Sequence, residues 1–201
     1  MAEHYYTENP ASESNESVFE FTFNGSAFAF TTDAGVFSRK QADMGSRVLL
    51  GAIPPIGGRI LDLGCGWGPL SIEAALRTQA AAEPPDVWAL DVNTRALDLT
   101  ADNARTLGLD RVRAVTADQV PTDLRFTTIW SNPPVRIGKP ALHQLLRTWL
   151  PRLTDDGTAW LVVARHLGAD SLHRWLADTL TRPVDRIASA KGFRVLRVGP
   201  A

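Results

Sequence analysis

The chain has 201 residues, of which 44% are hydrophobic and 21% charged, with a formal net charge of -1 and a single cysteine. This is ordinary globular composition in a chain long enough to bury a core without disulfides or a structural metal. One cysteine excludes an intramolecular disulfide framework and a cysteine-based zinc site. The start of the chain is polar and acidic, and no apolar run approaches the roughly 18 residues of a membrane span. We therefore expect a cytoplasmic protein with no membrane anchor and no metal.

The charge is distributed unevenly along the chain. Residues 1–131 hold 10 Lys and Arg against 17 Asp and Glu, a balance of -7, whereas residues 132–201 hold 11 against 5, a balance of +6. Such a basic segment is either an ordinary solvated surface or a surface that attracts an anionic partner. The sequence leaves both interpretations open.

The N-terminal part of the chain predicts a β-hairpin followed by a helix. Apolar residues alternate over 18–23 and again over 26–31, and the Asn-Gly pair between these runs is a strong hairpin signal. A helix is expected over 43–53. We expect the phenylalanines of the hairpin to cover the core rather than bind a ligand. Residues 1–53 are accordingly predicted to form an extension packed on a core domain of residues 54–201.

Beyond the extension, short apolar strands alternate with helices, which is typical of an α/β fold with a mostly parallel sheet. The last two strands have no helix between them, and this predicts an antiparallel strand at the end of the sheet. The expected strands are 59–63, 87–91, 112–116, 126–131, 158–164, 184–188 and 193–198, and the expected helices are 69–78, 94–107 with Thr94 as its N-cap, 139–153 and 169–180.

A glycine loop, DLGCGWG at residues 62–68, joins the first of these strands to a helix. Glycines let a backbone turn tightly and let a ligand approach it closely. A dinucleotide site has G-x-G-x-x-G, whereas the spacing here is G-x-G-x-G, and Asp62 would repel a pyrophosphate. Asp91, at the end of the next strand, can accept hydrogen bonds from ribose hydroxyls. The pattern favours a ligand with a ribose and a positive centre, such as S-adenosylmethionine.

This loop, together with the ALDVN segment that contains Asp91, resembles the first two motifs of the class I S-adenosylmethionine-dependent methyltransferases. The resemblance implies a Rossmann-like, doubly wound seven-stranded sheet with an antiparallel last strand. It also implies S-adenosylmethionine as cofactor and S-adenosylhomocysteine as product. Cys65 is expected to be a small loop residue and not a reactive thiol. The cofactor-binding residues implied are Asp62, Gly64, Cys65, Gly66, Gly68, Asp91 for the ribose, Val92, Asp118 and Gln119 for the adenine, and Asn132.

The fourth core strand ends in Asn132-Pro133-Pro134-Val135. Two prolines cannot continue a strand ladder, so a simple strand stop is one interpretation. Ligands of open α/β sheets bind beyond the carboxyl ends of the strands, however, so Asn132 should face the glycine loop. Its side-chain carbonyl and the Pro133 backbone carbonyl can each accept one N–H of an exocyclic amine, which would point the nitrogen lone pair at a methyl donor.

In the methyltransferases that it resembles, Asn-Pro-Pro followed by an aromatic residue marks methylation of planar amino groups on adenine, guanine or glutamine. The resemblance therefore implies that Asn132, Pro133 and Pro134 are catalytic. Val135 stands where the aromatic residue is usual, and Phe37 and Phe193 are candidate replacements for the lost stacking partner.

Longer stretches, among them HYYTENP, the aromatic hairpin, SNPPVRIGK and KGFRVLRV, resemble the small-domain ribosomal RNA guanine-N2 methyltransferases over nearly the whole chain. This implies transfer to guanine N2, with ribosomal RNA or the small ribosomal subunit as partner. Bacterial members of that group often carry a second copy of the domain, and this chain has one, so a monomer or a homodimer is expected. Phosphates would meet the basic segment that follows the Asn-Pro-Pro turn. The substrate-binding residues implied are Phe37, Ser38, Val135, Arg136, Lys139 and Phe193.

Three alternatives stay open on the sequence. The acceptor could be a protein glutamine, which suits the same Asn-Pro-Pro geometry, or it could be a small-molecule amine. The third alternative is a module that binds the cofactor or RNA without catalysis. A methyl-transfer assay on ribosomal subunits, total protein and small amines separates them.

Overall fold

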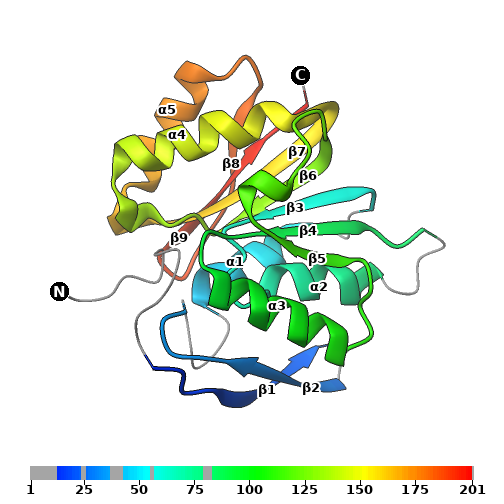
Figure 1. The fold of residues 1–201 in the computed structure, drawn as a ribbon. Coiled ribbons are helices and arrows are strands. Elements are labelled where there is room, and N and C mark those ends of the chain that lie inside the picture. The colour runs from blue at the N-terminus through cyan, green and yellow to red at the C-terminus, as the bar shows by residue number, and fades with distance from the viewer. Residues whose placement is uncertain (1–12, 24–25, 37–42, 55–56, 79–82, 201) are drawn as a thin grey trace.

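The computed structural model (Figure 1) contains a seven-stranded sheet in the order β5-β4-β3-β6-β7-β9-β8, in which β9 runs antiparallel to both of its neighbours. The predicted α/β class and the antiparallel last strand are confirmed. The residues that the structure describes are 13–23, 26–36, 43–54, 57–78 and 83–200. The strands of this sheet are β3 (Arg59–Leu63), β4 (Asp86–Leu90), β5 (Val112–Val115), β6 (Phe126–Ser131), β7 (Leu153–Ala164), β8 (Val184–Ala190) and β9 (Phe193–Val198).

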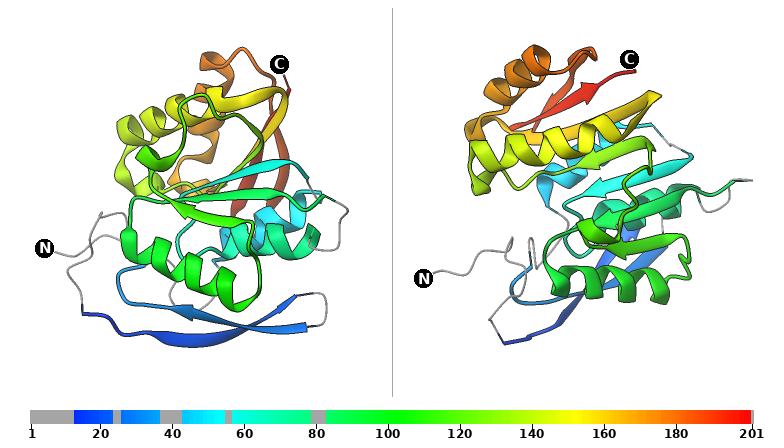
Figure 2. Two further views of the ribbon diagram at one scale, coloured as in Figure 1. Left: turned by 45° about the vertical axis from the view of Figure 1, so that its right-hand side comes forward. Right: turned by 45° about the horizontal axis from the view of Figure 1, so that its top comes forward.

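Helices cover both faces of this sheet (Figures 1 and 2). Successive side chains of a strand point to opposite faces, so neighbours on β3 enter different layers of the core. Ile60 packs with Leu49 and Leu70 on one face, whereas Leu61 packs with Leu146 on the other. Within the described ranges, no helix has the length and apolar character needed to span a bilayer. The helices of the first face are α1 (Met44–Ala52), α2 (Pro69–Thr78) and α3 (Thr94–Thr106), and those of the second are α4 (Lys139–Trp149) and α5 (Ala169–Thr179).

The boundary between α4 and β7 differs from the prediction of one helix over 139–153. The helix ends at Trp149, a 3₁₀ turn covers residues 150–152, and β7 starts at Leu153 rather than at residue 158. The cause is Pro151, which has no N–H to donate to the preceding helical turn and therefore stops the helix. The extra residues lengthen β7 at its amino end, where Leu153 pairs with Phe126 at the start of β6.

The start of α3 also differs from the prediction. Its N-cap is Asn93, whose side-chain oxygen accepts a hydrogen bond from the backbone N–H of Ala96 at 3.2 Å, and Thr94 is the first helical residue. Asparagine is among the best N-cap residues because its short side chain reaches back to the free N–H groups of the first turn.

The predicted hairpin is present as a separate two-stranded antiparallel sheet of β1 (Ser17–Phe23) and β2 (Ser26–Thr32). It lies beside α3, away from the main sheet (Figure 1). Phe30 is buried, and the centre of its ring lies 5.5 Å from the centre of the Trp67 ring in the glycine loop. The side chains of the phenylalanines in β1 lie outside the described residues. Through Phe30 the hairpin covers the loop as well as the helical layer.

A buried amide on α3 ties the hairpin to the glycine loop. The Asn103 side chain accepts a hydrogen bond from the Thr31 backbone N–H at 2.8 Å and donates to the Thr31 carbonyl at 2.9 Å. It also donates to the carbonyl of Trp67 at 3.2 Å. The amide thus satisfies backbone groups of two segments that a buried position would otherwise leave unpaired.

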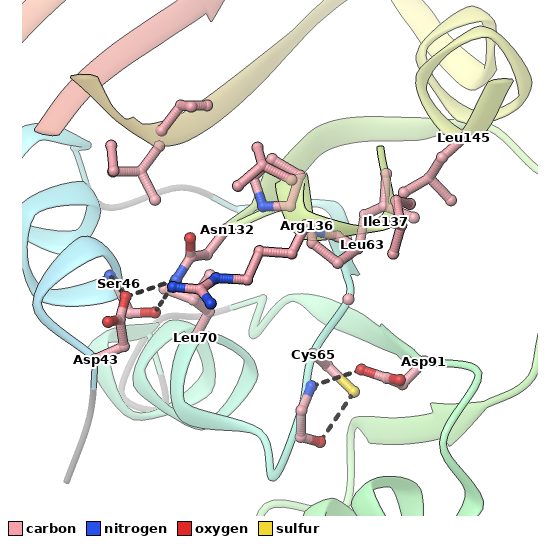
Figure 3. Close-up of a pocket in the computed structure, with 18 of the residues that line it drawn as sticks. Asp43, Ser46, Leu63, Cys65, Leu70, Asp91, Asn132, Arg136, Ile137 and Leu145 are labelled. Atoms are coloured by element: carbon pink, nitrogen blue, oxygen red, sulfur yellow. Dashed lines mark hydrogen bonds between the residues drawn. The ribbon is translucent and has the colours of Figure 1, made fainter. Parts of the chain in front are cut away.

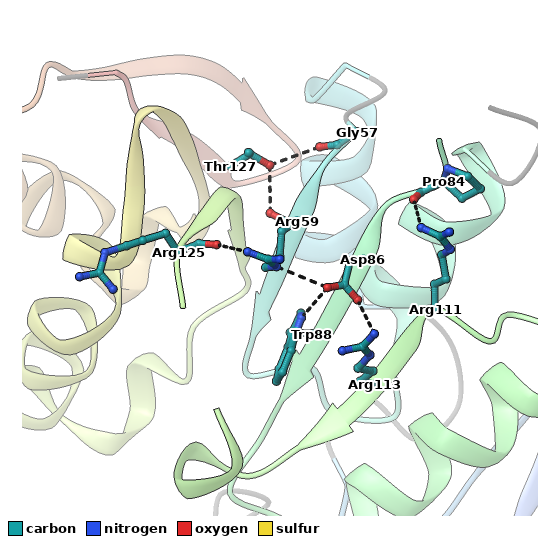
Figure 4. Close-up of polar contacts among 9 residues, drawn as sticks. All are labelled: Gly57, Arg59, Pro84, Asp86, Trp88, Arg111, Arg113, Arg125 and Thr127. Atoms are coloured by element: carbon teal, nitrogen blue, oxygen red, sulfur yellow. Dashed lines mark hydrogen bonds and ion pairs between the residues drawn. The ribbon is translucent and has the colours of Figure 1, made fainter. Parts of the chain in front are cut away.

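The amino ends of β3, β4 and β5 are joined around Asp86 (Figure 4). Its carboxylate pairs with Arg59 at 3.4 Å and with Arg113 at 3.3 Å, and it accepts a hydrogen bond from the Trp88 indole at 3.1 Å. These exposed pairs contribute little stability individually, although they connect three adjacent strands. They occupy the edge of the sheet opposite to the one on which the predicted site residues lie.

Candidate active site

A cavity of about 490 Å³ opens at the carboxyl ends of β3, β4, β6 and β7. One side is formed by the glycine loop and Asp91, and the other by residues 132–137 with side chains from α4 and from the segment after β7. Figure 3 shows residues from both sides facing this space. The carboxyl edge is where open α/β sheets bind their ligands, because the loops that follow successive parallel strands gather there.

The conformation of the glycine loop requires its glycines. Gly64, Gly66 and Gly68 have φ values of +81°, +58° and +93°, in the region that residues with a Cβ atom seldom adopt. The backbone N–H groups of Gly64 and Cys65 donate to the Leu90 carbonyl at 2.8 and 2.9 Å, which fixes the loop on the end of β4. A Cβ atom on Gly66 would meet nothing within 4 Å, so the backbone there borders open space in which a ligand can approach it.

Asp91 follows β4 and is fixed by the backbone around it. One carboxylate oxygen accepts from the Gly66 N–H at 2.9 Å and the other from the Asn93 N–H at 3.0 Å. Burial raises the pKa of Asp91, against the effect of hydrogen bonds from the backbone of Asn93, Gly66 and Val92. Each oxygen of a carboxylate has more than one acceptor site, so a pair of ribose hydroxyls could still be bound from the cavity.

Asp62 lies beneath the glycine loop and is fully buried. One of its oxygens accepts hydrogen bonds from the Ser71 backbone N–H at 3.0 Å and from the Ser71 hydroxyl at 2.7 Å. Its other oxygen, Oδ1, has no hydrogen-bond partner among the described residues. Burial raises the pKa of Asp62 from its ordinary value of 3.8 to about 7, with a further increase from the negative charge of Asp91, while the Ser71 hydrogen bonds lower it.

The residues around this loop fit S-adenosylmethionine. The ligand carries positive charge, and two acidic side chains lie at or beneath the loop, one of them with an unsatisfied oxygen. The Cys65 thiol is buried, and its pKa is raised well above the ordinary value by burial and by the charges of Asp91 and Asp62. A neutral buried thiol is a poor nucleophile, so Cys65 is not suited to act as a reactive thiol here.

Asn132 follows β6 and reaches the same cavity from the opposite side. A Cβ atom on Gly64 would lie 3.8 Å from the Pro134 ring, so the Asn-Pro-Pro turn and the glycine loop are neighbours. The Asn132 side-chain N–H₂ donates to Asp43 at 2.7 Å and to the Ser46 hydroxyl at 3.3 Å. Figure 3 shows the Asn132 carbonyl oxygen pointing away from these two partners. An acceptor of the kind needed to orient an amine therefore remains available on a residue that lines the cavity.

The remaining wall of the cavity is mostly apolar. Val135 and Phe193 line it, as does the side chain of Arg136, which is otherwise exposed. Phe37 and Ser38, which the sequence also suggests as substrate-binding residues, lie outside the described residues. Apolar side chains not predicted from the sequence complete the wall: Ile137, Ala141, Leu145, Val163 and Leu167.

Five predicted site residues are not among the residues lining the cavity, and one of them is Asp62, which is buried beneath the glycine loop. Asp118 and Gln119 are exposed in a 3₁₀ turn after β5, where both side chains bond to Thr116. Lys139 is exposed at the start of α4. Gly68 lies behind the loop, where a Cβ atom would come within 3.0 Å of Thr100.

Sequence reasoning missed the contribution of α1 to this site. Asp43 and Ser46 line the cavity, and both accept hydrogen bonds from the Asn132 side chain. The only signal available was that Asp43 is the first residue of a predicted helix. His166, which lines the cavity from the segment after β7, was also missed.

Comparison with known proteins also indicates a methyltransferase. Residues 27–197 match the methyltransferase small domain family. The chain is 34% identical to the Bacillus subtilis protein YbxB, described as uncharacterized, with 98% of both chains aligned. It is 33% identical to the ribosomal RNA small subunit methyltransferase C of Aeromonas hydrophila over 60% of its own length, and it spans only 34% of that relative.

Solved structures with the same fold include other methyltransferases. The T. thermophilus 16S rRNA N2 G1207 methyltransferase RsmC, in complex with AdoMet and guanosine, superposes with a TM-score of 0.79 at 22% identity. The match covers 92% of this chain and 51% of that one. A putative methyltransferase from Pseudomonas syringae gives a TM-score of 0.61 at 24% identity, over 77% of this chain and 96% of the other. At these identities the likeness establishes the fold, and the sequence match establishes the family: the chain belongs to the methyltransferase small domain family and is a class I S-adenosylmethionine-dependent methyltransferase.

Proposed function

We propose that this protein transfers the methyl group of S-adenosylmethionine to an exocyclic amino nitrogen, and that the substrate is guanine N2 in ribosomal RNA. The observation that carries the proposal is the orientation of Asn132. Its amide nitrogen is engaged by Asp43 and Ser46, which leaves the carbonyl oxygen to accept an N–H in the cavity shared with the glycine loop. The name of the relative from Aeromonas hydrophila supports ribosomal RNA as the substrate. The name of the T. thermophilus RsmC, solved in complex with AdoMet and guanosine, supports guanine N2 as the acceptor.

The cofactor half of the proposed site is the glycine loop and the residues after β4. The backbone of Gly64, Cys65 and Gly66 would hold the methionine portion, where positive φ angles and the absence of a Cβ atom allow close approach. Asp91 would accept hydrogen bonds from the ribose, and the exposed side chain of Val92 would pack on the adenine. Asp118 and Gln119 stand beyond Val92 after the neighbouring strand and would complete the adenine end.

The catalytic half needs positioning more than acid–base chemistry. S-adenosylmethionine, when bound, supplies an electrophilic methyl group on a sulfonium leaving group. The Asn132 carbonyl and the Pro133 carbonyl would accept the two N–H bonds of the amine, so that its lone pair points at the methyl carbon. The Pro133 carbonyl already accepts the Val135 N–H at 2.8 Å, which fixes its direction and leaves one further acceptor site. The nitrogen gains a carbon and releases one proton to water, so no strong base is required before the transfer.

The acceptor half has lost the usual aromatic partner at Val135. Phe193 lines the cavity on the side of Asn132 and offers a ring against which a base could stack, an interaction worth roughly 1–3 kcal/mol per base. Arg136, exposed at the cavity, could bind a phosphate next to the extruded guanine. The +6 balance of residues 132–201 would extend this attraction around the catalytic turn.

The test is a methyl-transfer assay with radiolabelled S-adenosylmethionine. The acceptors are small ribosomal subunits from a strain lacking guanine-N2 methyltransferases, total protein and a panel of small amines. We expect label in the ribosomal RNA and N2-methylguanosine in its nuclease digest. Asn132→Ala should abolish transfer, whereas Gln144→Ala, which removes an exposed amide on α4, should behave as wild type.

The other outcomes of this assay would each replace the proposal. Label in a protein glutamine or in a small amine would keep the methyltransferase and change its substrate class. Tight binding of S-adenosylmethionine without transfer to any acceptor would indicate a non-catalytic cofactor-binding module. Full activity of Asn132→Ala would refute the role given to the Asn-Pro-Pro turn.

A further inference from the structure

We infer that Asp43 is a positioning residue for methyl transfer: together with Ser46 it sets which end of the Asn132 amide faces the cavity, and Gly45 provides the space for this contact. The inference rests on the proposed role of Asn132. It makes the first turn of α1, 89 residues before the Asn-Pro-Pro turn in the sequence, a working part of the site.

The orientation of an asparagine amide matters because its two ends have opposite hydrogen-bonding properties. The oxygen accepts and the nitrogen donates, and a half-turn about the last side-chain bond exchanges them. Only one orientation presents an acceptor to an incoming amine. The amide needs an external partner to select it, because the two orientations have nearly the same shape.

Asp43 is a partner that selects one end. Its ionised carboxylate has only acceptors, so it attracts the N–H₂ end of Asn132, here at 2.7 Å, and would repel the carbonyl. Such hydrogen bonds to an ionised group are shorter and roughly twice as strong as neutral ones. The hydroxyl of Ser46, which is buried, lies 3.3 Å from the same nitrogen and offers a second acceptor. The Asn132 oxygen is left on the side away from α1 (Figure 3).

The carboxylate is itself held in place because it caps α1. The oxygen that binds Asn132 also accepts from the backbone N–H of Gly45 at 2.8 Å and of Ser46 at 3.4 Å. Helix N-caps have little freedom, since the side chain must reach back to free N–H groups of the first turn. One oxygen atom therefore connects the start of α1 to the Asn-Pro-Pro turn.

Gly45 is an independent observation that supports this contact. It is the second residue of α1 and does not have positive φ, so the backbone does not require a glycine there. A Cβ atom at this position would lie 2.7 Å from the Asp43 carboxylate, 3.0 Å from the Phe193 ring and 3.3 Å from the Asn132 nitrogen. The contact between Asp43 and Asn132 therefore requires that residue 45 has no side chain. Gly51, in the same helix, has nothing within 4 Å of its Cβ position.

This difference provides a matched pair of variants. Gly45→Ala should displace the Asn132 amide, and Gly51→Ala adds the same methyl group to the same helix without touching the site. A third variant, Asp43→Ser, keeps a good N-cap but removes the carboxylate that reaches Asn132. All three are compared in the full chain for thermal midpoint, affinity for S-adenosylmethionine, kcat and KM on small ribosomal subunits, and the side-chain amide resonances of Asn132. Those resonances are assigned by their absence in Asn132→Ala.

We expect Gly45→Ala and Asp43→Ser to shift the Asn132 amide resonances and to lower kcat about 100-fold, the size of effect that a misplacement of about 1 Å produces. Affinity for the cofactor should stay within about twofold of wild type, because the hydrogen bonds of the Asp43 carboxylate go to Asn132 and to the first turn of α1, and not to the glycine loop or Asp91. Gly51→Ala should match wild type in both measurements.

The inference is overturned if the amide resonances and kcat of Gly45→Ala and Asp43→Ser match those of Gly51→Ala. It is also overturned if kcat falls only in proportion to the folded fraction, since a purely structural role would do that. Failure of the proposed function is a different result. In that case wild type transfers no methyl group to RNA, while the amide resonances still report whether Asp43 orients Asn132.

Discussion

Asp62 should make the folded protein less stable as the pH rises from 5 to 8. Burial raises its pKa to about 7 in the folded state, whereas an aspartate in the unfolded chain has a pKa of about 3.9. Between these two values the folded state binds a proton that the unfolded state has released. The stabilisation from that proton is fully present below pH ~4 and is lost as the pH rises through about 7.

The size of the effect follows from the difference between the two pKa values. A shift of about 3 units corresponds to about 4 kcal/mol in the free energy of unfolding, and about 2.5 kcal/mol of this falls between pH ~5 and pH ~8. Asp62→Asn cannot ionise, and its carbonyl oxygen can still accept from Ser71. Its N–H₂ group takes the place of the unpartnered oxygen, at a cost of about 1–3 kcal/mol that does not depend on pH.

The measurement is urea unfolding, followed by tryptophan fluorescence at several pH values between 5 and 8, for wild type and Asp62→Asn. The stability of the variant relative to wild type should improve by about 2.5 kcal/mol across this range. Asp98→Asn, which changes an exposed carboxyl on α3, serves as the control and should show no such trend. Parallel pH profiles for wild type and Asp62→Asn would mean that the buried carboxyl is already ionised at pH 5, and the burial argument would be wrong.

Three further predictions concern the cofactor side of the site. Affinity for S-adenosylmethionine, measured by calorimetry, should rise between pH 6 and pH 8 in wild type as Asp62 ionises, and a similar rise in Asp62→Asn would contradict this origin. Gly66→Ala should lower stability by about 1–2 kcal/mol, because a residue with a Cβ atom is strained at φ +58°. It should also weaken cofactor binding at least about tenfold, because the Cβ atom would enter the open space beside the loop, and unchanged binding would refute the close approach of the cofactor to this backbone. Asn103→Ala should lower stability by about 2–4 kcal/mol and speed hydrogen exchange at the Thr31 amide, since buried backbone groups lose their partners, and unchanged exchange would show that Asn103 does not hold the hairpin.

Local sequence patterns were enough for most of the elements. Strand β3 and helix α2 have the bounds expected, because an apolar run, a glycine loop and a proline mark them within a few residues. The end of α4 was misjudged although Pro151 was visible. The apolar pattern continues through the proline, and the early start of β7 depends on its pairing with β6, which is a contact between distant segments.

Some features of the site could be predicted from local sequence patterns, and others could not. The glycine loop and the Asn-Pro-Pro turn could be expected to meet, since each follows a strand and parallel strands bring their carboxyl ends to one edge. The structure places both on one cavity. Asp118 and Gln119 were also expected at the ligand; their side chains bond within their own exposed turn and do not line the cavity, so their part in adenine binding stays a prediction. A motif indicates which loop is near the ligand and does not indicate the direction in which each side chain points.

The sequence by itself determined the α/β class, the antiparallel last strand, the methyltransferase family and the two segments that face each other across the cavity, because these depend on local periodicity and on short motifs. Only the tertiary structure decided that the cap of α1 engages the Asn132 amide, that Phe193 reaches the same corner, and that Asn103 holds the hairpin on the glycine loop. Each of these is a contact between residues more than 30 positions apart, made by a side chain whose local role looked like an ordinary cap, strand or helix position. Such contacts are set by how the layers pack, and no local pattern in the chain encodes them.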